Sequence, residues 1–143
     1  ENENTNVSGP PALAVSDEGS VVVAWRQEID DARNDIWSRS YKDGTWNTAQ
    51  QIDNSGEEDV SLNSLVIDDL GNAMAAWSFS IDGGASNIYT ARLNSQGWQT
   101  PKALNDNTQQ GEDAAQTYLY VNDFGRISAM WRHSSQTWFA EFK

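Results

Sequence analysis

Apolar residues recur at every second position in several short runs of this chain, and polar turn residues separate the runs. The run at residues 21–25 is apolar at its alternating positions and also at the positions between them. A period of two is typical of β-strands, and a strand that is apolar at both sets of positions is typically buried on both faces. No stretch carries a capped helical pattern longer than one turn. The pattern therefore predicts an all-β protein.

The same arrangement of strands and turns occurs three times, with a period of about 52 residues. Each copy has two alternating apolar residues, an Asp-x-Gly turn and a second apolar run that ends in tryptophan. The steps between the turn aspartates are 52 and 54 residues, and repeats of this length are typical of propellers and other repeat architectures. The matching residues are Leu13, Val15, Asp17, Gly19, Val21, Val23 and Trp25; Leu65, Ile67, Asp69, Gly71, Ala73, Ala75 and Trp77; and Leu119, Val121, Asp123, Gly125, Ile127, Ala129 and Trp131.

Each copy continues in a way that predicts four antiparallel strands. In the first copy a third strand carries Ile36, Trp37 and Tyr41, and a glycine-containing turn leads to a fourth strand at residues 45–52. Four short strands in a long repeat with aromatic landmarks are typical of a β-propeller blade. We therefore expect a single all-β domain of β-propeller blades over residues 1–143. Its repeats cover about 1–52, 53–104 and 105–143, and the third repeat lacks its outer strand.

Three blades are too few for a closed ring, because propellers typically have 4–8 blades. With blades that start near residues 7, 59 and 113, the apolar faces of the first and third blades have no neighbour. The chain is then either a partial propeller completed by further blades of a longer chain, or half of a six-bladed ring formed by two copies. We expect self-association in moderate salt, because salt screens the repulsion between acidic copies.

Composition narrows the partners and the compartment. The chain has 21 acidic and nine basic residues, a formal net charge of −12, and no cysteine. Such a charge repels phosphate backbones, so no nucleic-acid partner is expected. No apolar run approaches the roughly 18–20 residues of a membrane span. An acidic, cysteine-free sequence rich in Asn, Gln and Ser suits a bacterial secreted, periplasmic or cell-surface protein.

The second copy resembles the blades of bacterial secreted and cell-surface β-propellers, which include sialidase-like and lectin-like proteins. It reads D-x-x-G-N-A-x-A-x-W over residues 68–77, I-Y-x-x-R over 88–92 and G-W at 97–98. The resemblance covers nearly the whole chain and implies the fold rather than one activity. The sialidase Asp box, S-x-D-x-G-x-T-W, is not matched, because Val15, Ile67 and Val121 stand where the box has Ser or Thr.

Acidic residues concentrate at one predicted rim, formed by the loops between second and third strands and by the loops between repeats. This rim is either a solvated surface or a site for sugar hydroxyls, a cationic ligand or Ca²⁺, which prefers carboxylate oxygens. The aromatic residues that follow the rim loops either pack between blades or stack on pyranose rings. The candidate ligand-binding residues are Trp37, Tyr89, Trp138, Glu57, Glu58, Asp59, Glu112 and Asp113. The candidate metal ligands are Asp30, Asp31 and Asp82, in a sequence that has no D-x-[DN]-x-[DN]-G calcium loop.

The sequence offers little for catalysis. His133 is its one histidine, which makes a Ser/His/Asp site difficult to assemble. Glu57 and Glu58 are adjacent, whereas glycoside hydrolysis needs two carboxyl groups that face each other across a sugar at about 5–10 Å. We expect a non-catalytic binding or scaffolding module of a secreted or cell-surface protein, with carbohydrate as the leading ligand and no cofactor other than Ca²⁺. The alternatives are a fragment of a sialidase-like or other glycoside hydrolase, and a protein-interaction scaffold.

Overall fold

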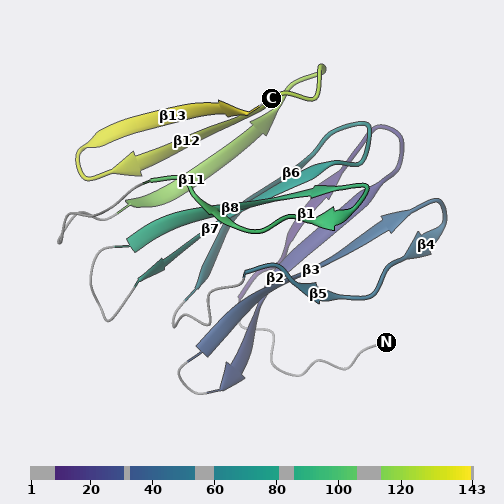
Figure 1. Cartoon of the computed structure of the whole chain (residues 1–143), viewed down its shortest axis with the longest axis horizontal. Coiled ribbons are helices and arrows are strands. Elements are labelled where there is room, and N and C mark those ends of the chain that lie inside the picture. The colour runs from purple at the N-terminus through teal and green to yellow at the C-terminus, as the bar shows by residue number, and fades with distance from the viewer. Residues whose placement is uncertain (1–8, 31–32, 54–59, 81–85, 106–113, 143) are drawn as a thin grey trace.

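Three antiparallel β-sheets make up the described part of the chain. The computed structural model describes residues 9–30, 33–53, 60–80, 86–105 and 114–142, and these ranges contain no helix. Figure 1 shows the third sheet above the second and the first sheet below it. The all-β prediction is therefore confirmed.

The first sheet is built from consecutive strands, and two short strands share its outer edge. Its strands are β1 (Ala12–Val15), β2 (Val21–Asp30), β3 (Arg33–Lys42), β4 (Thr45–Trp46) and β5 (Gln50–Gln51). The first four lie in the order β1-β2-β3-β4, and β5 also pairs with β3. The strand predicted at residues 45–52 is thus broken into two pieces.

Asn47 explains the break in this strand. Its backbone N–H donates to the Ser40 carbonyl at 2.9 Å, but its side-chain Oδ1, not its carbonyl, accepts from the Ser40 N–H at 2.7 Å. The freed Asn47 carbonyl accepts from Arg39 Nε at 2.6 Å. The side chain replaces one rung of the ladder, so the register shifts by one residue between β4 and β5.

The second sheet repeats this arrangement, and the third sheet has three strands within the described residues. Between β9 and β10 lies Pro101, which has no N–H to donate to a ladder. The strands of the second sheet are β6 (Ser61–Ile67), β7 (Ala73–Ser80), β8 (Ser86–Asn94), β9 (Gly97–Trp98) and β10 (Lys102–Ala103). Those of the third are β11 (Ala114–Val121), β12 (Ile127–His133) and β13 (Gln136–Phe142).

The sheets pack face to face, and the core lies between them. One cluster between the first and second sheets includes Ile36, Ile52 and Trp77, and the cluster between the second and third includes Met74 and Trp131. Trp77 is only 1% exposed. A hydrogen bond from the Leu119 N–H to Ser64 Oγ, at 3.0 Å, also joins the second and third sheets.

The turns between the first two strands of each sheet are closed by the residue before the repeated aspartate. Asp68 Oδ1 accepts from the backbone N–H groups of Leu70 at 2.9 Å and Asn72 at 2.8 Å. Asn122 makes the matching pair of bonds in the third sheet, and Ser16 Oγ accepts from the Ser20 N–H in the first. These N–H groups are bonded by the acceptor one position before the aspartate of each Asp-x-Gly, not by that aspartate. The turn glycines have positive φ, which glycine adopts without steric cost: Gly19 at 81°, Gly71 at 82° and Gly125 at 70°.

Neighbouring turns touch one another along this end of the sheets. A Cβ placed on Gly125 would lie 3.3 Å from Asp68 Oδ2, and one on Gly71 would lie 3.4 Å from Ser20 Oγ. Asp69 Oδ1 accepts from the Asp17 N–H at 3.2 Å, so this aspartate links two turns instead of closing one. The turns therefore form a continuous row across the three sheets.

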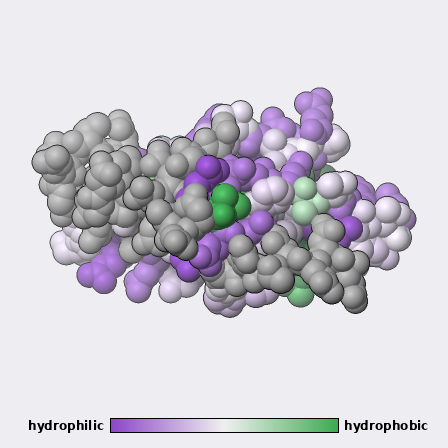
Figure 2. Space-filling model, turned by 90° about the horizontal axis from the view of Figure 1, so that it is seen from below, coloured by the Kyte–Doolittle hydropathy of each residue, from purple (hydrophilic) through white to green (hydrophobic). Residues whose placement is uncertain are grey.

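The described residues on one face of the molecule are largely hydrophilic (Figure 2). Seen from below the view of Figure 1, hydrophobic residues form only a few small spots among hydrophilic ones (Figure 2). In the described part of the chain, no helix has the length and apolar character that a membrane crossing needs.

Candidate functional site

A groove of about 260 Å³ lies between the outer edges of the first and second sheets. One wall comes from β5 and the two residues that follow it, and the other from the end of β9 and the connection to β10. The residues that line the groove are Gln51, Ile52, Asp53, Trp98, Gln99, Thr100 and Pro101. The groove lies where the outer strand of each sheet is interrupted, and the Gln99 N–H still donates to the Arg92 carbonyl of its own sheet at 2.7 Å.

Trp98 is the aromatic residue of the groove. It is half-buried and packs against two of the core clusters, which fixes its position. Gly97, with a φ of 101°, allows the tight turn that starts β9. The polar residues that line the groove are Gln51, Gln99, Thr100 and Asp53. The Gln99 amide donates to Asn94 Oδ1 at 3.3 Å and to the Gly97 carbonyl at 3.1 Å, within its own turn. An apolar surface with a few placed polar groups is the usual composition of a small-molecule site.

Asp53 holds the end of the outer strand against β3. Its Oδ1 accepts from the Ile36 N–H at 2.8 Å, next to the Ile52 N–H bond to the Ile36 carbonyl at 2.8 Å. The residue is only 2% exposed. Burial, aided by the nearby Asp35 carboxylate, raises the pKa of Asp53 from 3.8 to about 6, although the bonds from Ile36 and Gln51 act in the opposite direction.

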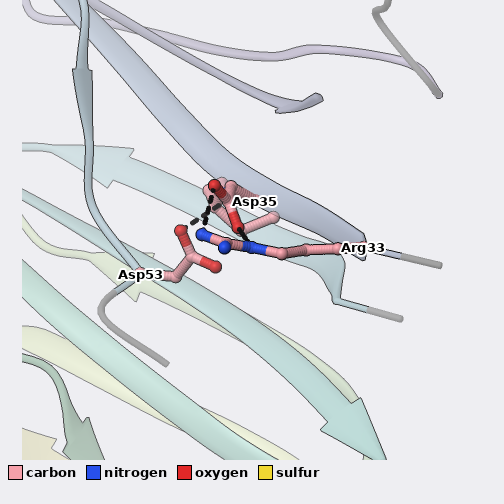
Figure 3. Close-up of polar contacts among 4 residues, drawn as sticks. Arg33, Asp35 and Asp53 are labelled. Carbon is pink, nitrogen blue, oxygen red and sulfur yellow. Dashed lines mark hydrogen bonds and ion pairs between the residues drawn. The ribbon is translucent and has the colours of Figure 1, made fainter. Parts of the chain in front are cut away.

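Arg33 and Asp35 form an ion pair beside Asp53, as Figure 3 shows. Arg33 Nε and Nη2 donate to the two carboxylate oxygens of Asp35 at 2.9 and 3.0 Å. Asp35 is buried, and the bidentate arginine compensates the loss of water around its carboxylate. The arginine therefore neutralises one of two acidic groups that the fold brings together.

The second sheet has an uncharged version of the same arrangement. Asn105 Oδ1 accepts from the Ile88 N–H at 2.7 Å, in the place of Asp53, and Asn105 Nδ2 donates to Asn87 Oδ1 at 3.3 Å, in the place of Asp35. A carboxyl group that titrates near pH 6 can exchange a proton close to neutrality. Because the asparagine makes the same bond without a proton to exchange, the shared role of this position is to fix the outer strand.

A second groove, of about 480 Å³, lies between the second sheet and the end of β13. Arg92 and Lys102 are among its lining residues, together with Thr90 and Phe142. The Arg92 guanidinium lies 5.7 Å from the centre of the Phe142 ring. This groove is basic, in contrast to the first.

The predicted aromatic candidates lie in three different sheets and line neither groove. Trp37 is half-buried in β3 and pairs with Trp25 across the ladder. The Tyr89 ring packs 4.9 Å from the Phe79 ring, beside the core between the first and second sheets. Trp138 is exposed, with its ring 6.4 Å from that of His133. The structure does not bring them together.

Most of the predicted acidic candidates lie outside the described residues. Asp30 ends β2, and its side chain is not among those described. Glu57, Glu58, Asp59, Glu112, Asp113, Asp31 and Asp82 lie outside the described residues. Within the described ranges, no group of three or more His, Cys, Asp or Glu residues could hold a metal ion.

The groove residues were not among the candidate site residues, although the repeat contains a signal for them. Extending the alignment by one position past Ile52 and Leu104 pairs Asp53 with Asn105. Both residues offer a side-chain oxygen, so the column has a shared chemistry. Trp98 gives no such signal, because a tryptophan that repeats at one position is explained equally well by packing between sheets and by ligand binding.

Comparison with known proteins supports the fold and no specific family. No protein-family model and no curated protein matches the chain. Among solved structures, the Hadza microbial sialidase Hz136 aligns with a TM-score of 0.54 and 16% identity, over 86% of this chain and 32% of the sialidase. An endo-arabinase from Bacteroides thetaiotaomicron VPI-5482 aligns with a TM-score of 0.51 and 16% identity, over 93% and 55%.

A protein of unknown function from Dyadobacter fermentans DSM 18053 aligns with a TM-score of 0.50 and 11% identity, over 98% of this chain and 66% of the other. The chain thus spans between 32% and 66% of the length of these three structures. At these identities the likeness concerns the fold alone.

Proposed function

We propose that the chain is a non-catalytic carbohydrate-binding module of a bacterial secreted or cell-surface protein, and that each of its sheets is a β-propeller blade. The observation that carries the proposal is the groove between the first and second sheets, which is lined by Trp98 together with the Gln51 amide and the Thr100 hydroxyl. An aromatic face suits the apolar side of a pyranose ring, and the polar groups suit its hydroxyls. Similarity of fold to a sialidase and an endo-arabinase supports this ligand class.

Binding to a glycan array that includes sialosides and arabinans tests the proposal. Gln51→Ala and Thr100→Ala remove polar groups at the groove and should each weaken binding about tenfold, the value of one hydrogen bond of roughly 1.4 kcal/mol. Gln96→Ala, in the exposed turn before β9, is the matched control and should leave binding unchanged. Binding that is equal in all four proteins would place the sugar site elsewhere, and no binding at millimolar glycan would contradict the carbohydrate proposal.

Calcium enters as a second condition of the same experiment. If Asp30, Asp31 and Asp82 supply ligands, binding should fall when a chelator removes Ca²⁺ and return when Ca²⁺ is added. The same result in all three conditions would show that the module needs no metal ion.

The second candidate is that the chain forms part of a glycoside hydrolase. It is favoured by the two glycosidases among the similar structures, of which this chain covers only 32% and 55%. Turnover of a fluorogenic glycoside panel, abolished by Glu57→Gln or Glu58→Gln, would support hydrolysis. Absence of turnover together with groove-dependent binding would support the non-catalytic module.

A further inference from the structure

Contacts between sheets always join the same two faces. Each sheet has two faces, which we name forward and back. The forward face carries Val22, Ala24 and Ile36 in the first sheet and Met74, Ala76 and Ile88 in the second. The back face carries Ala75, Trp77 and Ala91 in the second sheet and Leu119, Ala129 and Trp131 in the third. The forward face of the first sheet packs on the back face of the second, and the forward face of the second packs on the back face of the third.

The back face of the first sheet is apolar and uncovered. Leu13, on this face, is 64% exposed, whereas Leu119 at the equivalent position of the third sheet is buried. Val15 is exposed, whereas its equivalent Ile67 is buried. Trp25 is half-buried, although both of its equivalents are buried. The residue types are those of an inter-sheet contact, but no sheet in the described part of the chain packs on this face.

The forward face of the third sheet is also apolar and uncovered. Tyr118 pairs with Met130, and Met130 with Phe139, so the three side chains form a row across three strands. All three are exposed, Phe139 to 81%, and Tyr120 beside them is exposed as well. With aromatic side chains that bury about 150–250 Å² each, this row and Tyr120 offer on the order of 500 Å² of apolar surface. A lone soluble domain seldom leaves such a patch in water.

We infer that the two faces bind each other between copies, so that the third sheet of one chain packs on the first sheet of a second chain. The internal contacts give the orientation. Arg92 on a forward face lies over Phe142 on the next back face, and the equivalent positions hold Glu141 and Tyr41. Arg39 shares the back face with Tyr41, so Glu141 of one copy approaches a guanidinium of the other. The faces thus match in polarity and in charge.

Two copies joined in this way form a closed pair. Each copy has one forward and one back face free, so a two-fold axis satisfies all four faces with two equal contacts. Met130 and Phe139 are larger than Ala76 and Thr90 at the equivalent positions. The contact between copies therefore joins a forward face to a back face, as the internal contacts do, with a larger distance between the two sheets.

Light scattering on the purified chain at tens of micromolar and about 0.3 M salt tests the mass, which should be twice the chain mass of 15.9 kDa. Phe139→Lys blocks the forward face and Leu13→Lys blocks the back face, and each should give a monomer. Lysine lowers the net negative charge, so repulsion between copies cannot explain dissociation. Phe124→Lys is the matched control, because Phe124 is 87% exposed in the turn between β11 and β12 and off both faces; this variant should stay dimeric.

Mixing the two blocked variants distinguishes this contact from other dimers. Phe139→Lys keeps a good back face and Leu13→Lys keeps a good forward face, so the mixture should form a one-to-one pair through a single contact. If like faces paired, one variant would remain dimeric alone and mixing would add nothing, which would overturn the inference. A monomeric wild type, an assembly larger than two copies or a dimer that survives Phe139→Lys would also overturn it, provided that circular dichroism shows both variants folded as the wild type.

Discussion

Asp53 and Asn105 accept the same hydrogen bond in successive sheets, from the Ile36 N–H at 2.8 Å and from the Ile88 N–H at 2.7 Å. One residue is a carboxyl group with a raised pKa and the other is an amide, so the chain contains its own control for the effect of charge at this position. The electrostatic cost of the acidic version is therefore open to direct measurement.

Asp53→Asn should raise the melting temperature at pH 7 by a few degrees at most. Burial raises the pKa of Asp53 to about 6, so folding favours the neutral carboxyl group. The stability that the neutral Asp53 carboxyl group contributes is complete when the pH is below the ordinary pKa of 3.8, and it is lost as the pH rises through about 6. Thermal melts from pH 4 to pH 8 should therefore show a larger gain for the variant at high pH than at low pH.

The reverse change, Asn105→Asp, serves as the control for that measurement. It should lower the melting temperature at pH 7, and this decrease should become smaller as the pH falls toward 4. A less stable Asp53→Asn protein at pH 7 would mean that the ionised carboxylate is stabilising in the folded state.

Asp68→Ala should destabilise the fold by about 1–3 kcal/mol, because the Leu70 and Asn72 N–H groups lose their acceptor. Asp68→Asn keeps an acceptor oxygen, as Asn122 does in the third sheet, and should cost much less. Asp69→Ala should change stability by no more than about 0.5 kcal/mol, because this exposed residue does not close the turn. Urea unfolding of the three variants gives the ranking, and a larger loss for Asp69→Ala than for Asp68→Ala would contradict it.

Trp77→Ala should cost about 3–5 kcal/mol, the usual loss for a large buried aromatic residue. Trp25→Ala changes the equivalent residue of the first sheet and should cost roughly half as much, because that ring is only half-buried. Denaturant unfolding at low micromolar protein, where copies are least associated, compares the two. Equal losses would show that the back face of the first sheet is covered in solution.

Gly125→Ala should be more destabilising than Gly19→Ala. Both glycines have positive φ, at 70° and 81°, and an alanine pays about 1–2 kcal/mol in that region. A Cβ on Gly19 meets nothing within 4 Å, whereas one on Gly125 presses on the Asp68 carboxylate. Thermal melts should therefore rank the wild type above Gly19→Ala and Gly19→Ala above Gly125→Ala, and equal losses would show that the neighbouring turn yields freely.

The strands and glycine turns were predictable because they depend on local periodicity and backbone conformation. The turn acceptors were not, because Ser16, Asp68 and Asn122 differ in residue type. They share only a side-chain oxygen that accepts from the backbone N–H four residues later. The candidate site was harder to predict from the sequence than the turns. How deeply a repeated tryptophan is buried depends on whether another sheet faces it, since Trp77 is fully buried and Trp25, at the equivalent position, is only half-buried.

The row of touching turns divides the molecule into a constrained end and a permissive end. An extra residue near Gly71 or Gly125 would lengthen a loop and would also push two neighbouring sheets apart, since each glycine rests against the preceding turn. At the opposite end the connection between the second and third strands already varies in length, with two residues in the first and third sheets and five in the second. New binding surfaces, whether they arise by mutation or by loop grafting, can therefore be added at that end without altering how the sheets are spaced.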